Sequence, residues 1–468
     1  MLLKYVSTRG EAPVLAFDDV LLAGLAEDGG LYVPESWPQF SADELSAMAG
    51  LSYAEIAYRV IRPFIAGAIP DSDLENMIEE TYAGFGHSAV APMKQIGQNE
   101  WLMELFHGPT LAFKDFALQL VGRMFAHVLA ARGERVTIVG ATSGDTGSAA
   151  IEACRDRDNI DVFILFPEGR VSPVQQRQMT TVDSANVHAI AVDGTFDDCQ
   201  DLVKGMFNDA QFRTALNLSA VNSINWARVM VQIVYYFAAA VRLGAPQRPV
   251  SFAVPTGNFG NVLAGWAAWK CGLPIDRLVI GTNSNDILFR FFESGEMKMA
   301  GVAPTLSPSM DIQVSSNFER LLFDMLGGDG AAVRDWIAEF RETGTVSVDD
   351  ARLAAAHEKF DAARLDDDGT QRVIREIYDT TGELLDPHSA IGVDAARQCR
   401  GDRSVPMISL ATAHPAKFPD AVQAATGVHP ALPDRMAGLF DRDEKFATLP
   451  NDITAVQDFV RKAAGGRA

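Results

Sequence analysis

Two glycine-rich loops in this sequence carry groups that could bind anions. The first, Gly140–Gly147, reads Gly-Ala-Thr-Ser-Gly-Asp-Thr-Gly and follows the β-branched run Val136–Val139. It offers hydroxyl groups at Thr142, Ser143 and Thr146, and peptide N–H groups at the start of the helix expected next. A helix N-terminus of this kind favours a carboxylate or a phosphate. Taken alone, the loop is equally consistent with a turn capped by Ser and Thr side chains.

The second loop, Pro255–Asn261, reads Pro-Thr-Gly-Asn-Phe-Gly-Asn and lies between the run Val250–Val254 and an expected helix, Val262–Lys270. Gly257 and Gly260 permit a ligand to approach the backbone closely. The loop contains no Lys or Arg, so a phosphate would be held by peptide dipoles. Ligands bind beyond the carboxyl ends of parallel strands, which is where both glycine-rich loops are expected. Either loop alone could be a simple turn, but the presence of both favours a binding site.

Lys114 and Thr412 are the other candidate functional residues. Lys114 lies in His107–Phe116, at or just before the start of a long expected helix. A cation is disfavoured at a helix N-terminus, which favours a functional role, although a solvated surface lysine is the more common case. Thr412 follows the run Val405–Leu410, so it would lie near the sheet edge where the two glycine-rich loops are expected. Taken alone, this threonine is more simply explained as a residue whose hydroxyl caps a helix.

The elements that position these residues alternate between short strands and helices. Such alternation predicts a mostly parallel sheet covered by helices on both faces, an α/β fold. The expected strands are Val136–Val139, Val162–Phe166, Val187–Val192, Val250–Val254, Leu278–Ile280 and Val405–Leu410.

The chain is expected to contain an N-terminal, mostly helical region and a larger catalytic region. Residues 1–95 form the first, with capping boxes at Ser41–Glu44 and Ser52–Glu55. Residues 96–468 form the second, with two α/β subdomains, the smaller at roughly 110–220. A charge-rich segment at about 343–386 is expected to be an appended helical insertion.

Composition limits the possible partners. The chain has 468 residues, 48% hydrophobic and 22% charged, which excludes wholesale disorder. Its net charge of −21 argues against nucleic acid and anionic membranes, and the longest apolar run, Val229–Val241, predicts a buried helix rather than a membrane span. No zinc-ligand spacing is present, so no metal is expected. Four widely spaced cysteines indicate a reducing compartment, so we expect a cytoplasmic protein.

Taken together, the motifs resemble the threonine synthases, pyridoxal-phosphate (PLP) enzymes of fold type II. The resemblance covers essentially the whole chain and implies two open, mostly parallel αβα sandwich domains, an N-terminal helical region and an appended helical segment. The matching elements are Gly24–Pro34, His107–Asp115, Ala141–Gly147, Asn222–Arg228, Pro255–Asn261 and Asp386–Gly392.

The resemblance also implies roles for individual residues. Lys114 matches the catalytic lysine that forms the Schiff base with PLP, and Thr412 matches the hydroxyl that contacts the pyridine nitrogen. The cofactor phosphate would be held by Gly257, Asn258, Phe259, Gly260 and Asn261. The amino-acid carboxylate would be bound by Thr142, Ser143, Gly144, Asp145 and Thr146. The substrate phosphate would lie near Asn225, Arg228, Ser315, Asn317 and Arg320, for which structural capping and surface charge are the alternatives.

The implied reaction converts O-phospho-L-homoserine and water to L-threonine and phosphate, the last step of threonine biosynthesis. Lys114 would act as general base for several proton transfers. Two alternatives stay open: another PLP lyase of the same fold, either a dehydratase or a phospholyase that gives 2-oxobutyrate, and a non-catalytic ligand-binding relative. Lys114 and the two loops argue against the last. We expect a small-molecule substrate and a monomer or weak dimer.

Overall fold

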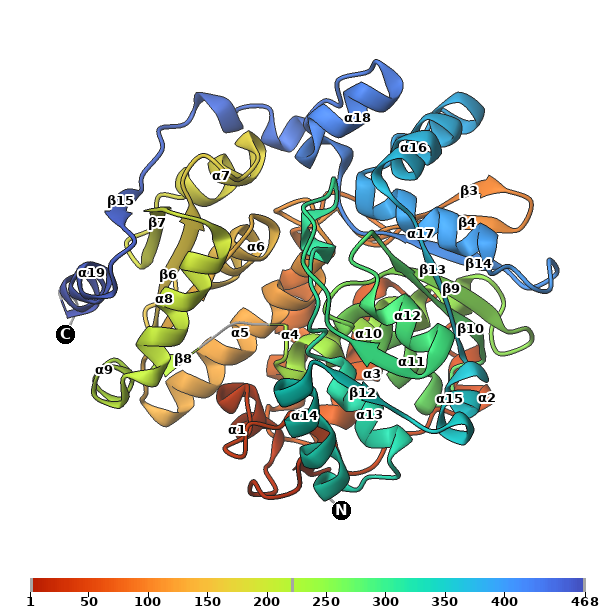
Figure 1. Ribbon diagram of the computed structural model, residues 1–468, viewed down its shortest axis with the longest axis horizontal. Coiled ribbons are helices and arrows are strands. Elements are labelled where there is room, and N and C mark those ends of the chain that lie inside the picture. The colour runs from red at the N-terminus through yellow and green to blue at the C-terminus, as the bar shows by residue number, and fades with distance from the viewer. Residues whose placement is uncertain (1–2, 220–222, 466–468) are drawn as a thin grey trace. The chain divides into compact units, whose positions relative to one another are not determined.

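The computed structural model describes residues 3–219 and 223–465. They form two compact units, whose elements are labelled in Figure 1. Unit 1 consists of residues 3–21, 25–113 and 223–430, and unit 2 of residues 22–24, 114–219 and 431–465. Among the helices of the described residues, none is both long and apolar enough to cross a membrane.

Unit 1 is built on a six-stranded sheet with the order β13-β10-β9-β14-β4-β3 (Figure 1). All neighbouring strands are parallel except β3 and β4. Since β9 and β14 are parallel neighbours, the segments that follow them leave the sheet at the same edge. The strands are β3 Met93–Gly97, β4 Glu100–Glu104, β9 Val250–Pro255, β10 Ile275–Thr282, β13 Phe360–Arg364 and β14 Met407–Ala411.

Helices of unit 1 cover this sheet. α17 packs on β14, β9 and β10, while α10 packs on α11 and α3. Every residue of α10 from Trp226 to Val241 is buried, which confirms the predicted buried helix. The helices are α2 Ala42–Ser46, α3 Tyr53–Ile65, α4 Asp71–Ala83, α10 Trp226–Arg242, α11 Gly260–Lys270, α12 Ile287–Ser294, α13 Phe318–Met325, α14 Gly330–Thr343, α15 Asp350–His357, α16 Asp367–Thr381, α17 Pro387–Gln398 and α18 Pro419–Thr426. α1 (Phe17–Ala23) begins in unit 1. Unit 1 also has two small antiparallel sheets: β1 (Tyr5–Ser7) pairs with β2 (Tyr32–Pro34), and β11 (Glu296–Lys298) pairs with β12 (Thr345–Ser347).

Unit 2 contains a five-stranded, wholly parallel sheet with the order β15-β7-β6-β5-β8 (Figure 1). Its central strand β6 is buried at every residue, as expected for a strand covered on both faces. The strands are β5 Val136–Ala141, β6 Ile160–Pro167, β7 Val187–Asp193, β8 Leu218–Ser219 and β15 Ala447–Pro450. The helices are α5 Lys114–Arg132, α6 Asp145–Cys154, α7 Pro173–Thr180, α8 Phe196–Asn208, α9 Ala210–Ala215 and α19 Ile453–Gly465.

Each predicted strand is present, and both predicted capping boxes form. The segment 343–386 contains the helices α15 and α16 and also the short strands β12 and β13, of which β13 pairs with β10 at the edge of the sheet. The sequence of β13, Phe-Asp-Ala-Ala-Arg, has a single large apolar residue, so pairing rather than intrinsic strand propensity determines its conformation. The C-terminal strand β15 pairs with β7 and so extends unit 2 beyond residues 110–220.

Candidate active site

Lys114 is the first residue of α5 in unit 2. Its Nζ lies 3.5 Å from Oδ2 of Asp145, and the two side chains are 10% and 5% exposed. The other oxygen of Asp145 accepts a 2.9 Å hydrogen bond from Nε2 of Gln175. A buried carboxylate therefore holds the lysine amino group in a defined position. Gln175 was not predicted as a site residue; its sequence signal is the capping box that begins at Ser172.

The loop after β5 is shaped by Thr142. Its Oγ1 accepts hydrogen bonds from the N–H groups of Gly144 and Gly147, at 3.0 Å and 2.8 Å. Gly144 has a φ of 136°, and a Cβ at this position would lie 2.4 Å from Cδ of Gln175. A side chain is thus excluded at Gly144 both by the backbone conformation and by the close contact.

Ser143 and Thr146 occupy the same loop with their hydroxyl groups available. Both residues are half-buried, and neither hydroxyl makes a hydrogen bond to a residue in the described part of the chain. The loop also leads directly into α6, whose N-terminal end favours a negatively charged group. These features fit a small carboxylate.

The Gly257–Asn261 loop joins β9 to α11 in unit 1. Among the described residues, none accepts a hydrogen bond from the peptide N–H of Gly257, Asn258 or Phe259. Phe259 has a left-handed backbone (φ 63°) and is the N-cap residue of α11. Three free N–H groups at the positive end of a helix fit a phosphate group.

Asn261 adds a side-chain donor to this loop. It is 6% exposed, and its Oδ1 accepts hydrogen bonds from the hydroxyl groups of Tyr235 (2.7 Å) and Tyr236 (2.9 Å). This arrangement fixes the amide orientation. Its Nδ2 is buried and has no acceptor among the described residues. Since a buried donor without a partner is costly, it fits a bound anion such as the cofactor phosphate.

Ser315 and Asn317 hold the loop from the other side. Ser315 Oγ donates a 2.7 Å hydrogen bond to the carbonyl oxygen of Gly257. Asn317 Nδ2 donates 3.0 Å hydrogen bonds to the carbonyl oxygens of Asn258 and Ser223. The donors of both predicted substrate ligands are therefore directed at the protein backbone.

Arg320 is also bonded to the protein. It is 1% exposed; its Nε donates to the carbonyl oxygen of Tyr32 at 2.9 Å and its Nη2 to that of Ile224 at 2.6 Å. Its Nη1 donates to Oδ1 of Asn317. Every nitrogen of this guanidinium group has a protein acceptor.

Arg228, in the first turn of α10, has a different environment. It is 4% exposed, and its Nε and Nη1 are buried without an acceptor in the described part of the chain. Burial lowers the pKa of Arg228 to about 10, so the group stays cationic at neutral pH. Its neighbour Asn225 caps the helix through Ala227 N–H and donates to the carbonyl oxygen of Leu21, which leaves Arg228 as the free donor here. Asn222, the first residue of this motif, lies outside the described residues.

Thr412 directly follows β14 and is 5% exposed. Its N–H donates a 3.1 Å hydrogen bond to Ser389 Oγ, and its carbonyl oxygen accepts one of 2.8 Å from the N–H of Phe113. Its own hydroxyl bonds to no described residue. Phe113 immediately precedes Lys114 in the sequence.

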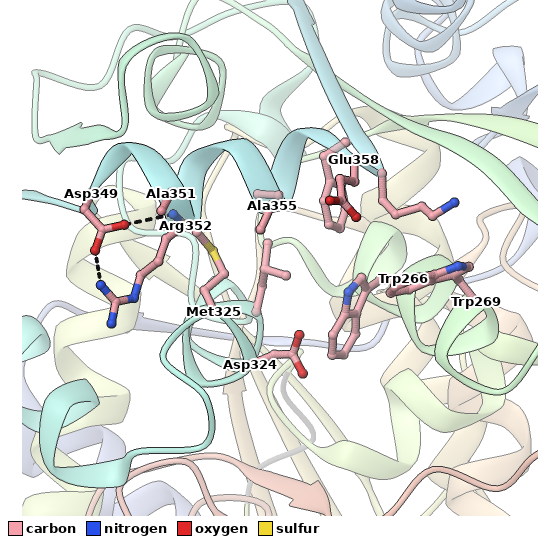
Figure 2. A pocket seen from close by; sticks show the side chains of 13 residues that line it. Trp266, Trp269, Asp324, Met325, Asp349, Ala351, Arg352, Ala355 and Glu358 are labelled. Carbon is pink, nitrogen blue, oxygen red and sulfur yellow. Dashed lines mark hydrogen bonds and ion pairs between the residues drawn. The ribbon is translucent and has the colours of Figure 1, made fainter.

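Unit 1 also has a cavity of about 590 Å³, and none of the predicted site residues lines it. Figure 2 shows the side chains around it. Trp266, Asp324, Asp349 and Arg352 are among the residues that line it. Some of the ionic groups that line it are paired within the protein: Arg352 contacts Asp349, and Lys270 lies 2.9 Å from Asp324. The cavity is not part of the predicted site.

Comparison with known proteins agrees with this geometry. Residues 4–82 match the family model "Threonine synthase N terminus", residues 88–340 match "Pyridoxal-phosphate dependent enzyme", and residues 389–460 match "Threonine synthase, C-terminal". The threonine synthase of Pseudomonas aeruginosa is 58% identical over 459 residues, which covers 98% of each chain. That of Saccharomyces cerevisiae is 44% identical over 455 residues, covering 90% of this chain and 88% of its own.

Solved structures give the same result. A PLP-bound threonine synthase from Brucella melitensis superposes with a TM-score of 0.97 at 58% identity, covering 99% of both chains. The Escherichia coli threonine synthase gives 0.83 at 33% identity, covering 98% of this chain and 99% of its own.

The fold and the matched region 88–340 place the protein among the PLP-dependent enzymes of fold type II. Within that class, the chain belongs to the threonine synthase family. It is a PLP-dependent lyase with threonine synthase activity, and the comparisons do not support a dehydratase, another phospholyase or a non-catalytic relative.

Proposed function

We propose that this enzyme converts O-phospho-L-homoserine and water to L-threonine and phosphate, with PLP attached to Lys114. The observation that carries the choice of substrate is Arg228, a buried cation whose Nε and Nη1 have no acceptor among the described residues. An unpaired buried charge is costly unless a ligand pairs with it. A phosphorylated amino acid brings a matching dianion, whereas a plain hydroxyamino acid does not.

The cofactor would be held by two parts of unit 1. The free N–H groups of Gly257–Asn261 and the Asn261 amide would bind its phosphate, and the hydroxyl of Thr412 would contact the pyridine nitrogen. When bound, PLP supplies an electron-withdrawing ring next to Cα of the substrate.

The substrate would be held at its two charged ends. The hydroxyl groups of Ser143 and Thr146 and the positive end of α6 would bind its carboxylate, and Arg228 its phosphate. The remaining predicted ligands would act by positioning these groups. They are Thr142, Gly144, Asp145, Asn225, Ser315, Asn317 and Arg320.

Lys114 would carry the protons. Its amino group, released when the substrate amine takes its place, would accept the Cα proton, pass that proton on, and then accept a Cβ proton as the γ-phosphate leaves. It would deliver this second proton to Cγ, water would add its hydroxyl group at Cβ, and a proton would return to Cα. Asp145, held by Gln175, keeps the Lys114 amino group in a fixed position.

An assay with O-phospho-L-homoserine tests the proposal. We expect equal amounts of phosphate and threonine from the wild type and no threonine from Lys114→Ala, which should retain the fold. Phosphate with 2-oxobutyrate in place of threonine would disprove the proposed reaction. Threonine formation near the wild-type rate in Lys114→Ala would disprove the role of the lysine.

We also propose that the enzyme works in the cytoplasm as a monomer or weak dimer. The four cysteines are free thiols, which supports a reducing compartment. Sedimentation at several protein concentrations tests the oligomeric state, and a stable tetramer would contradict it.

A further inference from the structure

The start of α17 holds a buried carboxylate with more hydrogen bonds than a helix cap requires. Asp386 is 0% exposed and is the N-cap residue. Its Oδ1 accepts from the N–H of His388 at 2.9 Å and from Nδ1 of the same residue at 2.8 Å. Its Oδ2 accepts from the N–H of Ser389 at 3.3 Å and from the Ser389 hydroxyl. The hydrogen bonds from the peptide N–H groups are sufficient to cap the helix. The hydrogen bond from the Ser389 hydroxyl is therefore not needed for capping.

That hydroxyl connects Asp386 to Thr412. A serine hydroxyl has one hydrogen and a carboxylate only accepts, so the hydrogen of Ser389 points to Asp386 and its oxygen is left as an acceptor. The N–H of Thr412 fills it, 3.1 Å from Ser389 Oγ. Ser389 is 1% exposed, and an acceptor polarised by a buried anion binds more strongly than a free hydroxyl.

The Thr412 backbone is held from a second direction. Its carbonyl oxygen accepts the 2.8 Å bond from Phe113, and Ala112 pairs with Ala413 in an antiparallel bridge. The β-branched threonine side chain has few χ1 choices. Once the backbone is fixed on both sides, the hydroxyl of Thr412 is confined to a few positions.

We propose that Asp386 and Ser389 are positioning residues that fix the Thr412 hydroxyl against the pyridine nitrogen of PLP. This inference rests on the role proposed for Thr412 above. A hydroxyl, unlike a carboxylate, does not keep the ring nitrogen protonated, so the electron demand of the ring depends on the distance and angle of that hydrogen bond. A small displacement of Thr412 would therefore change the electronic state of the bound cofactor.

Ser389→Ala in the holoenzyme tests the proposal, because the Thr412 N–H then loses its acceptor. We expect a shifted pH titration of the cofactor absorption and a kcat for O-phospho-L-homoserine lower by about 10- to 100-fold, with KM changed by less than about threefold. Ser251→Ala is the matched control. Ser251 is 3% exposed in β9 of the same sheet, and its hydroxyl donates to Asp276 at 3.3 Å. This control should lose a partly buried hydrogen bond yet keep the wild-type absorption and kcat.

Two more variants keep the test decisive if Ser389→Ala does not fold. Ser389→Cys retains the side-chain size but is a weak acceptor, so it should shift the titration in the same direction. Asp386→Asn keeps a good helix cap but turns an amide NH₂ group toward Ser389 or His388. This variant should also shift the titration of the cofactor absorption. Wild-type absorption and kcat in the folded Ser389 variants and in Asp386→Asn would overturn the proposal.

Thr412→Val separates this inference from the proposed function. If Thr412→Val shifts the absorption titration and Ser389→Ala does not, the positioning role is wrong and the role of Thr412 stands. If Thr412→Val leaves the titration unchanged, the contact with the cofactor is wrong and the inference fails with it. If both shift it, Ser389→Ala should add nothing in the Thr412→Val background, as expected for residues that act through one hydroxyl.

Discussion

Two buried arginines in the first turns of two helices of unit 1 behave in opposite ways. Burial lowers the pKa of both guanidinium groups, Arg228 to about 10 and Arg320 to about 9, so both are cations at neutral pH. Each nitrogen of Arg320 donates to a protein oxygen, and its guanidinium lies 5.8 Å from the ring of Trp226. Arg228 has two buried nitrogens without an acceptor in the described part of the chain.

The comparison distinguishes a structural cation from one available to a ligand. Arg320 ties the start of α13 to the carbonyl oxygens of Tyr32 and Ile224, so its charge is used within the fold. Arg228 makes no comparable bonds, and its burial destabilises the free protein. A residue of this kind is retained when a ligand supplies the missing acceptors, which is the role proposed for it here.

Arg228→Met gives the largest effect that the comparison predicts. We expect kcat/KM for O-phospho-L-homoserine to fall by about 10²- to 10⁴-fold, because two charge-assisted hydrogen bonds are lost. The free energy of unfolding of the ligand-free protein should not fall, since a buried charge with two unpaired nitrogens is removed. Phosphate-release kinetics and urea unfolding measure the two quantities. An unchanged kcat/KM with a large loss of stability would assign Arg228 a structural role.

Arg320→Met should show the opposite pattern. We expect the free energy of unfolding to fall by about 1–3 kcal/mol, because Tyr32 O, Ile224 O and Asn317 Oδ1 lose their donor. The loop that Asn317 holds would loosen, so PLP should dissociate more readily. Under saturating PLP, kcat/KM should fall less than in Arg228→Met, and a larger fall would place Arg320 in contact with the substrate.

The sequence predicts the strands and loops that form the site, but it does not predict the difference between Arg228 and Arg320. The strands β5, β6, β7, β9, β10 and β14 are apolar, β-branched runs, and their local pattern is enough to identify them. The glycine loops and the lysine at a helix start are local signals as well. The edge strand β13 is not, because it depends on pairing with β10.

The partners of the arginines are distant in the chain. Arg320 donates to Tyr32, 288 positions away, and to Ile224, 96 positions away. No local pattern contains that information, so Arg228 and Arg320 look alike in the sequence. No local pattern predicts the hydrogen bond from Thr412 to Ser389 either, because the two residues are 23 positions apart. The Asp386-Pro387 pair does indicate the start of α17, the helix that contains Ser389.

Arg228→Lys sharpens the comparison with a smaller effect. Lysine keeps the positive charge but lacks the planar fork that binds a phosphate through two parallel hydrogen bonds. We expect kcat/KM to fall by about 10- to 100-fold, between wild type and Arg228→Met. A loss as large as that of Arg228→Met would mean that geometry, rather than charge, determines recognition at this position.

Inorganic phosphate gives the smallest effect and the most direct view of Arg228. The PLP-loaded enzyme is used so that the cofactor occupies its own phosphate loop. Phosphate at ten times its dissociation constant should stabilise the wild type against unfolding by about 1.4 kcal/mol. The protonated guanidinium binds the anion, and burial lowers its pKa to about 10, so this stabilisation should be full at pH 8 and decline as the pH rises through 10.

Arg228→Met should lose the stabilisation by phosphate at every pH, while Ser251→Ala should keep it. If phosphate stabilises Arg228→Met as much as wild type, the anion binds elsewhere. The unpaired nitrogens of Arg228 would then have no ligand to explain them. If phosphate stabilises Ser251→Ala but not Arg228→Met, the guanidinium group of Arg228 binds phosphate. The measurement needs no turnover, so it tests binding separately from the chemistry at Lys114.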